Sequence, residues 1–120
     1  MDKTLVDLTQ SLRRFAAERD WEQFHSPKNL AMALSVEVAE LLEHFQWLTE
    51  AESLRLSPAE LRAVRAEAAD VLIYLVRLAD RLDIDLLAAA EEKMVRNAEK
   101  YPVAECRGSA RRPAPPSELP

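Results

Sequence analysis

The sequence predicts an all-α protein with a single domain, and its composition is the main reason. Only one glycine occurs in 120 residues, whereas glycine averages about 7% of residues in proteins. Glycine supplies the tight turns of β-hairpins and the phosphate-binding loops of nucleotide folds, so its scarcity argues against hairpin-rich sheets, Rossmann folds and P-loops. Alanine, leucine, glutamate and arginine dominate instead, and all are strong helix formers. A chain of this length has room for one domain with one core.

Charge and cysteine content exclude further classes of protein. The net charge of −5 and the pI of about 5.1 offer no basic surface for a nucleic acid polymer. Cys106 is the only cysteine, so an intramolecular disulfide cannot form. The sequence shows neither a signal peptide nor a run of about 18 apolar residues, so we expect a soluble, cytoplasmic protein without membrane contact.

Apolar residues that recur every three to four positions predict four helices. Ser26 and Ser57 are suitable N-caps, because each precedes a proline that can occupy the first helical position. Asp85 is the expected cap of the last helix. The expected helical ranges are 3–19, 27–48, 58–82 and 86–101.

Prolines divide the chain into a domain and a tail. Five of the seven prolines lie between Pro102 and Pro120. This segment has too few apolar residues to pack, so we assign residues 1–102 to the folded domain and expect residues 103–120 to form a disordered tail. Residues 71–76 are apolar almost all round, which is typical of a helix that is central in a bundle or buried between subunits.

Two pairs of acidic residues border the apolar stripes of the second and third helices. Glu37 and Glu40 are three residues apart, as are Glu67 and Asp70, so each pair shares a helix face. A carboxylate beside a core must pair, take up a proton or bind a metal. Either these acids form ion pairs, or they hold a cation such as Mg²⁺ or Mn²⁺ between them. The candidate ion-pair partners are Lys28, Arg62, Arg65 and Arg77.

Basic and aromatic residues offer contacts for an anionic ligand that contains a ring. Lys93, Asn97 and Lys100 share one face of the last helix, where they either meet phosphate and sugar oxygens or form a solvated basic face. Trp21 lies in the polar connector 20–25, outside any apolar stripe, and can stack on a base. His25 is either a hydrogen-bonding group for that base or an ordinary loop residue.

Four segments resemble the dCTP pyrophosphatases among the MazG-like enzymes. They are residues 19–30 (RDWEQFHSPKNL), 37–47 (EVAELLEHFQW), 67–75 (EAADVLIYL) and 93–103 (KMVRNAEKYPV). They occur in the family's order and spacing, and the resemblance extends over residues 12–109. It implies a four-helix MazG-like bundle that assembles into dimers or tetramers, with sites at subunit interfaces.

The resemblance also implies a reaction and its site. A nucleoside triphosphate, with dCTP or a modified dCTP expected, would be hydrolysed to monophosphate and pyrophosphate in house-cleaning of the nucleotide pool. Glu37 or Glu40 would orient the attacking water, and Lys93 would stabilise the leaving group. The implied magnesium ligands are Glu37, Glu40, Glu67 and Asp70. The implied substrate contacts are Trp21, His25, Trp47, Tyr74, Lys93, Asn97 and Tyr101.

Several alternatives stay open at this stage. The animal enzymes have a histidine where this chain has Leu12, so the preferred base and sugar are not fixed. The sequence also does not give the number of metal ions. A non-catalytic helical interaction module would explain the apolar third helix but not the two acidic pairs. A di-iron bundle is set aside, because it needs Glu-x-x-His pairs that these acidic pairs lack.

Overall fold

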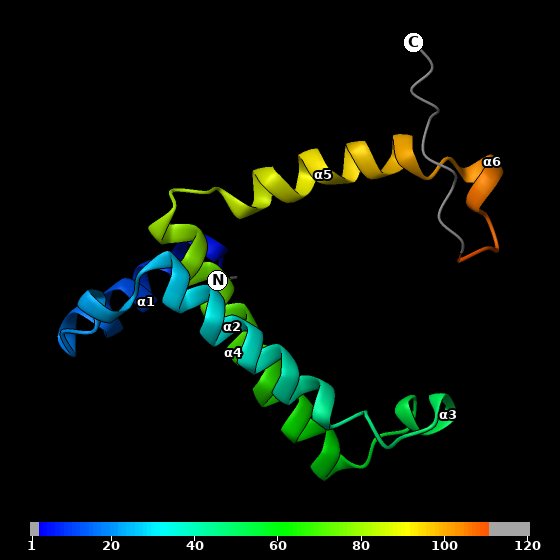
Figure 1. The fold of residues 1–120 in the computed structure, drawn as a ribbon, viewed down its shortest axis with the longest axis horizontal. Helices are drawn as coiled ribbons and strands as arrows, with labels where there is room; N and C mark the ends of the chain where they lie inside the picture. The colour runs from blue at the N-terminus through cyan, green and yellow to red at the C-terminus, as the bar shows by residue number, and fades with distance from the viewer. Residues whose placement is uncertain (1–2, 111–120) are drawn as a thin grey trace. The chain divides into compact units, whose positions relative to one another are not determined.

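The computed structural model describes residues 3–110, and all regular secondary structure within them is helical. The all-α prediction is therefore confirmed. No helix in this part of the chain is long and apolar enough to cross a membrane. The elements in chain order are α1 (Leu5–Glu18), the 3₁₀ helix η1 (Glu22–Phe24), α2 (Pro27–Glu43), α3 (Glu50–Ser53), α4 (Pro58–Arg81), α5 (Leu86–Lys100) and α6 (Val103–Cys106) (Figure 1).

Side-chain caps determine where the long helices begin. The hydroxyl of Ser26 accepts a hydrogen bond from the amide of Asn29 at 3.1 Å, and α2 starts at the following proline. Ser57 accepts in the same way from the amide of Glu60 at 3.1 Å before α4. The carboxylate of Asp85 accepts from the first turn of α5. All three predicted caps are confirmed, because a cap depends only on residues within one helical turn.

The end of α2 differs from the prediction. The helix ends at Glu43 rather than near Leu48, and a series of turns follows it. In these turns the amides of Phe45 and Leu48 bond to carbonyls three residues earlier, both at 2.9 Å. The apolar stripe continues through both residues, and no glycine or proline interrupts it, so the sequence contains no stop signal. The polar connection 49–56 between α2 and α4 contains the short helix α3.

Aspartate takes the place of glycine at the ends of α1 and α4. Asp20 and Asp83 have φ angles of 53° and 55°, the left-handed conformation that usually requires glycine after a helix. The next amide then bonds to the carbonyl five residues earlier, at 2.9 Å for Trp21 and 2.8 Å for Ile84. Aspartate tolerates this conformation better than most residues. Both helices therefore end in a left-handed residue without using glycine.

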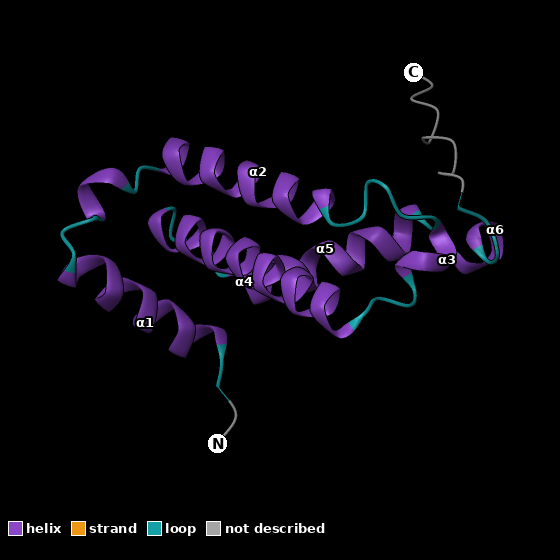
Figure 2. Ribbon diagram, turned by 90° about the horizontal axis from the view of Figure 1, so that it is seen from below, coloured by secondary structure: helices purple, strands orange, loops and turns teal. Residues whose placement is uncertain are grey.

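Helix α4 is central to the first of two compact units, Met1–Ile84 and Asp85–Pro120. It lies between α1 and α2 and packs against both (Figure 2). α2 and α4 are antiparallel, because His25 before α2 contacts Arg77 near the end of α4, whereas His44 after α2 lies near Glu67. This arrangement agrees with the central position predicted from the apolar run of residues 71–76.

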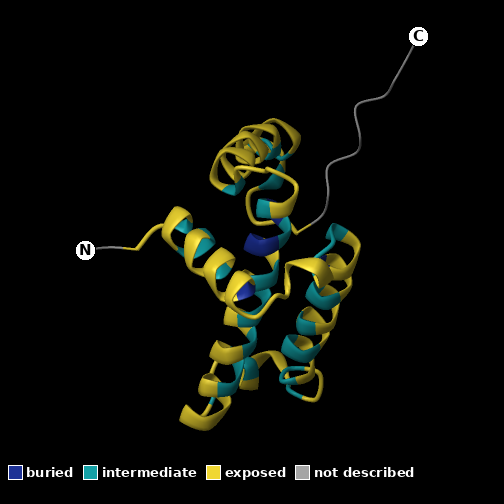
Figure 3. Ribbon diagram, turned by 90° about the vertical axis from the view of Figure 1, so that its left-hand side faces the viewer, coloured by how far each residue is buried: buried dark blue, intermediate teal, exposed yellow. Residues whose placement is uncertain are grey.

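The core within the described residues is small. Few residues of the helices are fully buried (Figure 3). Large apolar side chains such as those of Leu42, Leu54 and Met94 are among the exposed ones. Apolar surface on this scale is typical of proteins that bind a partner. The buried apolar residues are Ala16, Leu30, Val76 and Ala79.

The second unit contains α5 and the beginning of the segment predicted as a tail. Val103–Cys106 form α6, where the amide of Cys106 bonds to the carbonyl of Pro102 at 3.0 Å. The range predicted to be disordered thus begins with one helical turn, which starts directly after the fixed φ of proline. Residues 111–120 of the predicted tail lie outside the described residues.

Candidate functional site

Three carboxylates converge where α2 and α4 pack together. One oxygen from each of Glu37, Glu67 and Asp70 lies within 4.8 Å of the other two. All three side chains are half-buried. Glu40, also half-buried, is outside this group of three but lies beside Glu37 one turn later on α2. We call these four residues the acidic cluster.

The acidic cluster lacks compensating donors. The Oε2 atoms of Glu37 and Glu67 are buried and have no hydrogen-bond partner. Burial, as the largest cause, and the neighbouring acids Glu40, Asp70 and Glu67 together raise the pKa of Glu37 to about 7. Buried oxygens with like charges around them are stabilised by a proton or by a cation. The donor set consists entirely of carboxylates, which are the ligands that Mg²⁺ and Mn²⁺ prefer.

Basic side chains do not neutralise the cluster. Within residues 3–110, no lysine or arginine forms an ion pair with any of its four acids. Arg77, one of the partners considered from the sequence, bonds to Asp80 instead. The ion-pair interpretation is therefore not supported in this part of the chain.

His44 is a neighbour of the cluster that the sequence analysis did not select. Its Nε2 lies 4.0 Å from Oε1 of Glu67. The sequence contains a signal for this position, because His44 follows Glu37 by seven residues, about two helical turns, and so continues the same face.

A second set of polar contacts holds His25 against the end of α4. The guanidinium of Arg77, whose residue is only 5% exposed, donates from Nε to Nδ1 of His25 at 3.1 Å and from Nη1 to Asp80 at 3.3 Å. Arg81 donates from Nε to the backbone carbonyl of His25 at 3.0 Å. Arg13 on α1 donates from Nε to Asp80 at 2.8 Å. The ring and the backbone of His25 are therefore both fixed by α4.

Trp21 and His25 form one aromatic edge of the connector. Their ring centroids are 6.4 Å apart with an interplanar angle of 63°, and Phe15 packs edge-on against Trp21 at 5.7 Å. Trp21 remains 44% exposed. The structure thus brings these two predicted site residues together and leaves part of the indole available for a ligand.

Tyr74 lies on α4 between the acidic cluster and the His25 contacts. It follows Asp70 by four residues and precedes Arg77 by three, so the three share one flank of the helix. Asp70 and Arg77 are roughly 10 Å apart along the helix axis, at 1.5 Å per residue. Trp47 lies in the turns after α2 and is 87% exposed, so its ring is free to contact a ligand or another subunit.

The remaining predicted site residues belong to the second unit. Lys93 and Asn97 are four residues apart on α5, and the amide of Tyr101 bonds to the carbonyl of Asn97 at 2.8 Å. The Nζ of Lys100 lies 5.5 Å from the centre of the Tyr101 ring. These residues form one group on α5, and their role towards a substrate stays a prediction.

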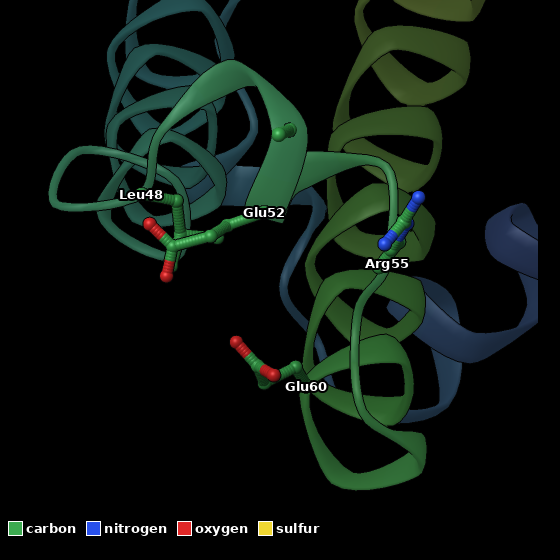
Figure 4. A pocket seen from close by; sticks show the side chains of 5 residues that line it. Leu48, Glu52, Arg55 and Glu60 are labelled. Atoms are coloured by element: carbon green, nitrogen blue, oxygen red, sulfur yellow. The ribbon is translucent and has the colours of Figure 1, made fainter.

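A pocket near the start of α4 contains none of the predicted site residues. Its volume is about 240 Å³, and the carboxylates of Glu52 and Glu60 lie beside it (Figure 4). Both carboxylates accept helix-capping hydrogen bonds, from the amides of Thr49 at 3.1 Å and Ser57 at 3.0 Å. These two acids therefore cap the N-termini of α3 and α4. The pocket is lined by Leu48, Ala51, Glu52, Arg55 and Glu60.

Comparison with known proteins gives consistent matches. A sequence profile of the MazG-like family matches residues 32–112. The chain is 50% identical over 111 residues to dCTP pyrophosphatase 1 of Rattus norvegicus. This alignment covers 91% of this chain and 65% of the rat protein. It is 49% identical over 113 residues to dCTP pyrophosphatase 1 of Homo sapiens, and that alignment covers 92% of this chain and 66% of the human protein. This chain thus spans about 65% of the length of these relatives.

A solved structure shares the fold. The crystal structure of a pyrophosphatase from Archaeoglobus fulgidus superimposes with a TM-score of 0.79 at 42% sequence identity. The match covers 85% of this chain and 95% of that one.

Proposed function

The chain belongs to the MazG-like family, and we propose that it is a Mg²⁺-dependent nucleoside triphosphate pyrophosphohydrolase. The observation that carries this proposal is the acidic cluster, with two buried carboxylate oxygens that have no partner. The proposed reaction converts a (deoxy)nucleoside triphosphate and water into the monophosphate and pyrophosphate. Since the animal relatives are dCTP pyrophosphatases, dCTP or a modified dCTP is the proposed substrate, in a house-cleaning role.

The proposed metal ligands are Glu37, Glu40, Glu67 and Asp70. When bound, Mg²⁺ or its substitute Mn²⁺ would supply positive charge against the phosphates and make a water molecule more acidic. Glu37 or Glu40 accepts a proton from the attacking water and directs its oxygen to the α-phosphorus. The bond from that phosphorus to the bridging oxygen breaks, and the electron pair leaves with pyrophosphate.

The aromatic edge of the connector would bind the base. Trp21 offers a half-exposed indole for stacking, and His25 offers a hydrogen-bonding ring beside it. Tyr74 lies between this edge and the acidic cluster along α4, where a sugar would pass. Lys93 would meet the phosphates and the departing pyrophosphate, with Asn97 and Tyr101 nearer the sugar.

We also propose that the protein assembles into dimers or tetramers with sites at subunit interfaces. The small core and the 87% exposure of Trp47 support this assembly, because both leave apolar surface for another copy to cover. Sedimentation equilibrium should give a mass that is two or four times 13.6 kDa. A monomer at micromolar concentration would contradict this part of the proposal.

Product analysis tests the reaction directly. Each dNTP, 5-methyl-dCTP and the ribonucleotides are incubated with the protein, with and without Mg²⁺. We expect metal-dependent formation of monophosphate and pyrophosphate, and Glu37→Gln should lower the rate by at least about 100-fold. Glu43→Gln is the matched control, because it makes the same change on the exposed side of α2. Diphosphate and orthophosphate would show attack at the γ-phosphorus and refute the mechanism.

A binding measurement separates the enzyme from the non-catalytic interaction module. A ligand at about 100 times its Kd stabilises the folded state by about 2.7 kcal/mol. Thermal unfolding with Mg²⁺ and a non-hydrolysable nucleotide should therefore occur at a clearly higher temperature. No turnover together with no stabilisation would favour the interaction module.

A further inference from the structure

The buried guanidinium of Arg77 is not explained by the proposed reaction. Arg77 is buried on α4 and donates to both His25 and Asp80. A buried charge is costly unless it is paired and hydrogen-bonded. Asp80 already accepts two hydrogen bonds from Arg13, so Arg77 is not needed to satisfy that carboxylate. The contact that Arg77 alone provides is the one to the imidazole ring of His25.

The donor and acceptor chemistry of this contact fixes the state of the ring. Arginine has five N–H donors, no acceptor and a permanent charge. Nδ1 of His25, 3.1 Å from Nε of Arg77, must therefore be the acceptor and carry no proton. A neutral imidazole holds one proton, which must be on Nε2. An imidazolium would instead place the N–H of its Nδ1 against the N–H of Arg77, and no hydrogen bond could form.

The charges around His25 favour the same state. Burial is the largest cause that lowers the pKa of His25, and the charges of Arg77 and Arg81 on α4 lower it further. Glu22 on η1 is the opposing group and raises it. Trp21 packs edge-on against the imidazole and limits its rotation. The ring is thus held with one free nitrogen, which is a donor.

We propose that Arg77 is a positioning residue that holds His25 as a neutral hydrogen-bond donor, through Nε2–H, for an acceptor atom on the substrate's base. This inference rests on the proposed function, in which His25 faces the base. Nε2–H can bond to an unprotonated ring nitrogen or a carbonyl oxygen but not to an N–H. Cytosine has an unprotonated nitrogen at ring position 3, where thymine and uracil carry N–H. A fixed donor that faces ring position 3 therefore favours cytosine over these bases, whereas one that faces the carbonyl at position 2, which all three bases share, would not distinguish them.

Nitrogen NMR of the metal-free protein tests the state of the ring without substrate. The chain has two histidines, His25 and His44, so a His44→Gln variant assigns the signals. We expect a protonated Nε2 and an unprotonated Nδ1 for His25. In Arg77→Met, protonation should occur at higher pH and the proton should exchange between both nitrogens. Arg77→Lys, which keeps a charged donor, should restore the wild-type state at least in part.

Arg81→Met is the matched control. It removes the same charge one turn later, but Arg81 contacts the backbone carbonyl and not the ring. The Nε2–H form should therefore persist in this variant. Arg77→Met should fold, because Arg13 still pairs with Asp80, and circular dichroism checks this. A proton on Nδ1 of His25 in the wild type, or the same ring state in Arg77→Met, would overturn the inference.

Steady-state kinetics test the consequence for substrate. Arg77→Met should raise KM for the cytosine nucleotide about five- to tenfold, the effect of one hydrogen bond, and reduce its preference over dTTP and dUTP. In a His25→Ala background, Arg77→Met should have no further effect on KM, since the two residues act as one unit. Independent effects of the two substitutions would overturn the positioning role. Absence of all turnover in the wild type would refute the proposed function but not the contact between Arg77 and His25. That contact is tested separately by the NMR measurement of the protonation state of His25.

Discussion

Proton release on Mg²⁺ binding is the most direct test of the acidic cluster. In the metal-free protein, burial and the neighbouring acids raise the pKa of Glu37 from 4.5 to about 7. A carboxylate must be ionised to bind a metal, so binding releases the proton of every protonated Glu37. For a pKa of about 7, roughly nine in ten of these groups are protonated at pH 6, half at pH 7 and one in ten at pH 8.

The expected magnitudes follow from these populations. Mg²⁺ should release about 0.9 proton per protomer at pH 6, about 0.5 at pH 7 and about 0.1 at pH 8. The apparent affinity should rise about fivefold from pH 6 to pH 7 and about twofold from pH 7 to pH 8. Without metal, Glu37 holds more protons in the folded state than in the unfolded state between pH 4.5, its ordinary pKa, and about pH 7, its pKa in the folded protein. The stability of the metal-free protein should therefore fall as the pH rises through this window.

Isothermal titration with MgCl₂ in buffers of different ionisation enthalpy measures the released protons. Glu37→Gln should bind more weakly and release no proton at any of the three pH values. Glu43→Gln should behave like the wild type, because Glu43 is exposed. If the wild type binds Mg²⁺ at pH 6 without releasing a proton, Glu37 is not a ligand and the reasoning is refuted.

Two further predictions concern the fold. Leu30→Ala should lower the free energy of unfolding by about 2–5 kcal/mol, because Leu30 is 1% exposed in a small core. Leu54→Ala, at an exposed site, should change the free energy of unfolding by less than about 0.5 kcal/mol. Urea unfolding compares the two, and equal effects would contradict the position of the core. Asp83→Gly should maintain or raise the stability, and Asp83→Val should lower it by about 1–2 kcal/mol, because this residue has a φ of 55°. If Asp83→Val were as stable as the wild type, the left-handed backbone conformation at this position would not strain a β-branched residue, and the prediction would be wrong.

Much of the local structure around the candidate site could be predicted because its signals are local. Caps such as Ser26 and Ser57 act within one turn, so the sequence placed the starts of α2 and α4 correctly. The spacing of Glu67 and Asp70 required only that the segment be helical for both to share a face. The end of α2 was wrong, since Phe45 and Leu48 continue the apolar stripe beyond the last helical residue. Periodicity records which face is apolar, not where the backbone leaves the helix.

The sequence by itself therefore determined an all-helical chain, its capped starts and two acidic pairs on separate helices. Only the tertiary structure decided which side chains meet across the helices. Arg77 shares a flank with Glu67 and Asp70 and was considered their partner, yet it bonds to His25, 52 residues away in sequence. Likewise, His44 reaches Glu67 only because α2 and α4 pack antiparallel. Local rules extend over one or two turns, whereas these contacts depend on the relative register of two packed helices.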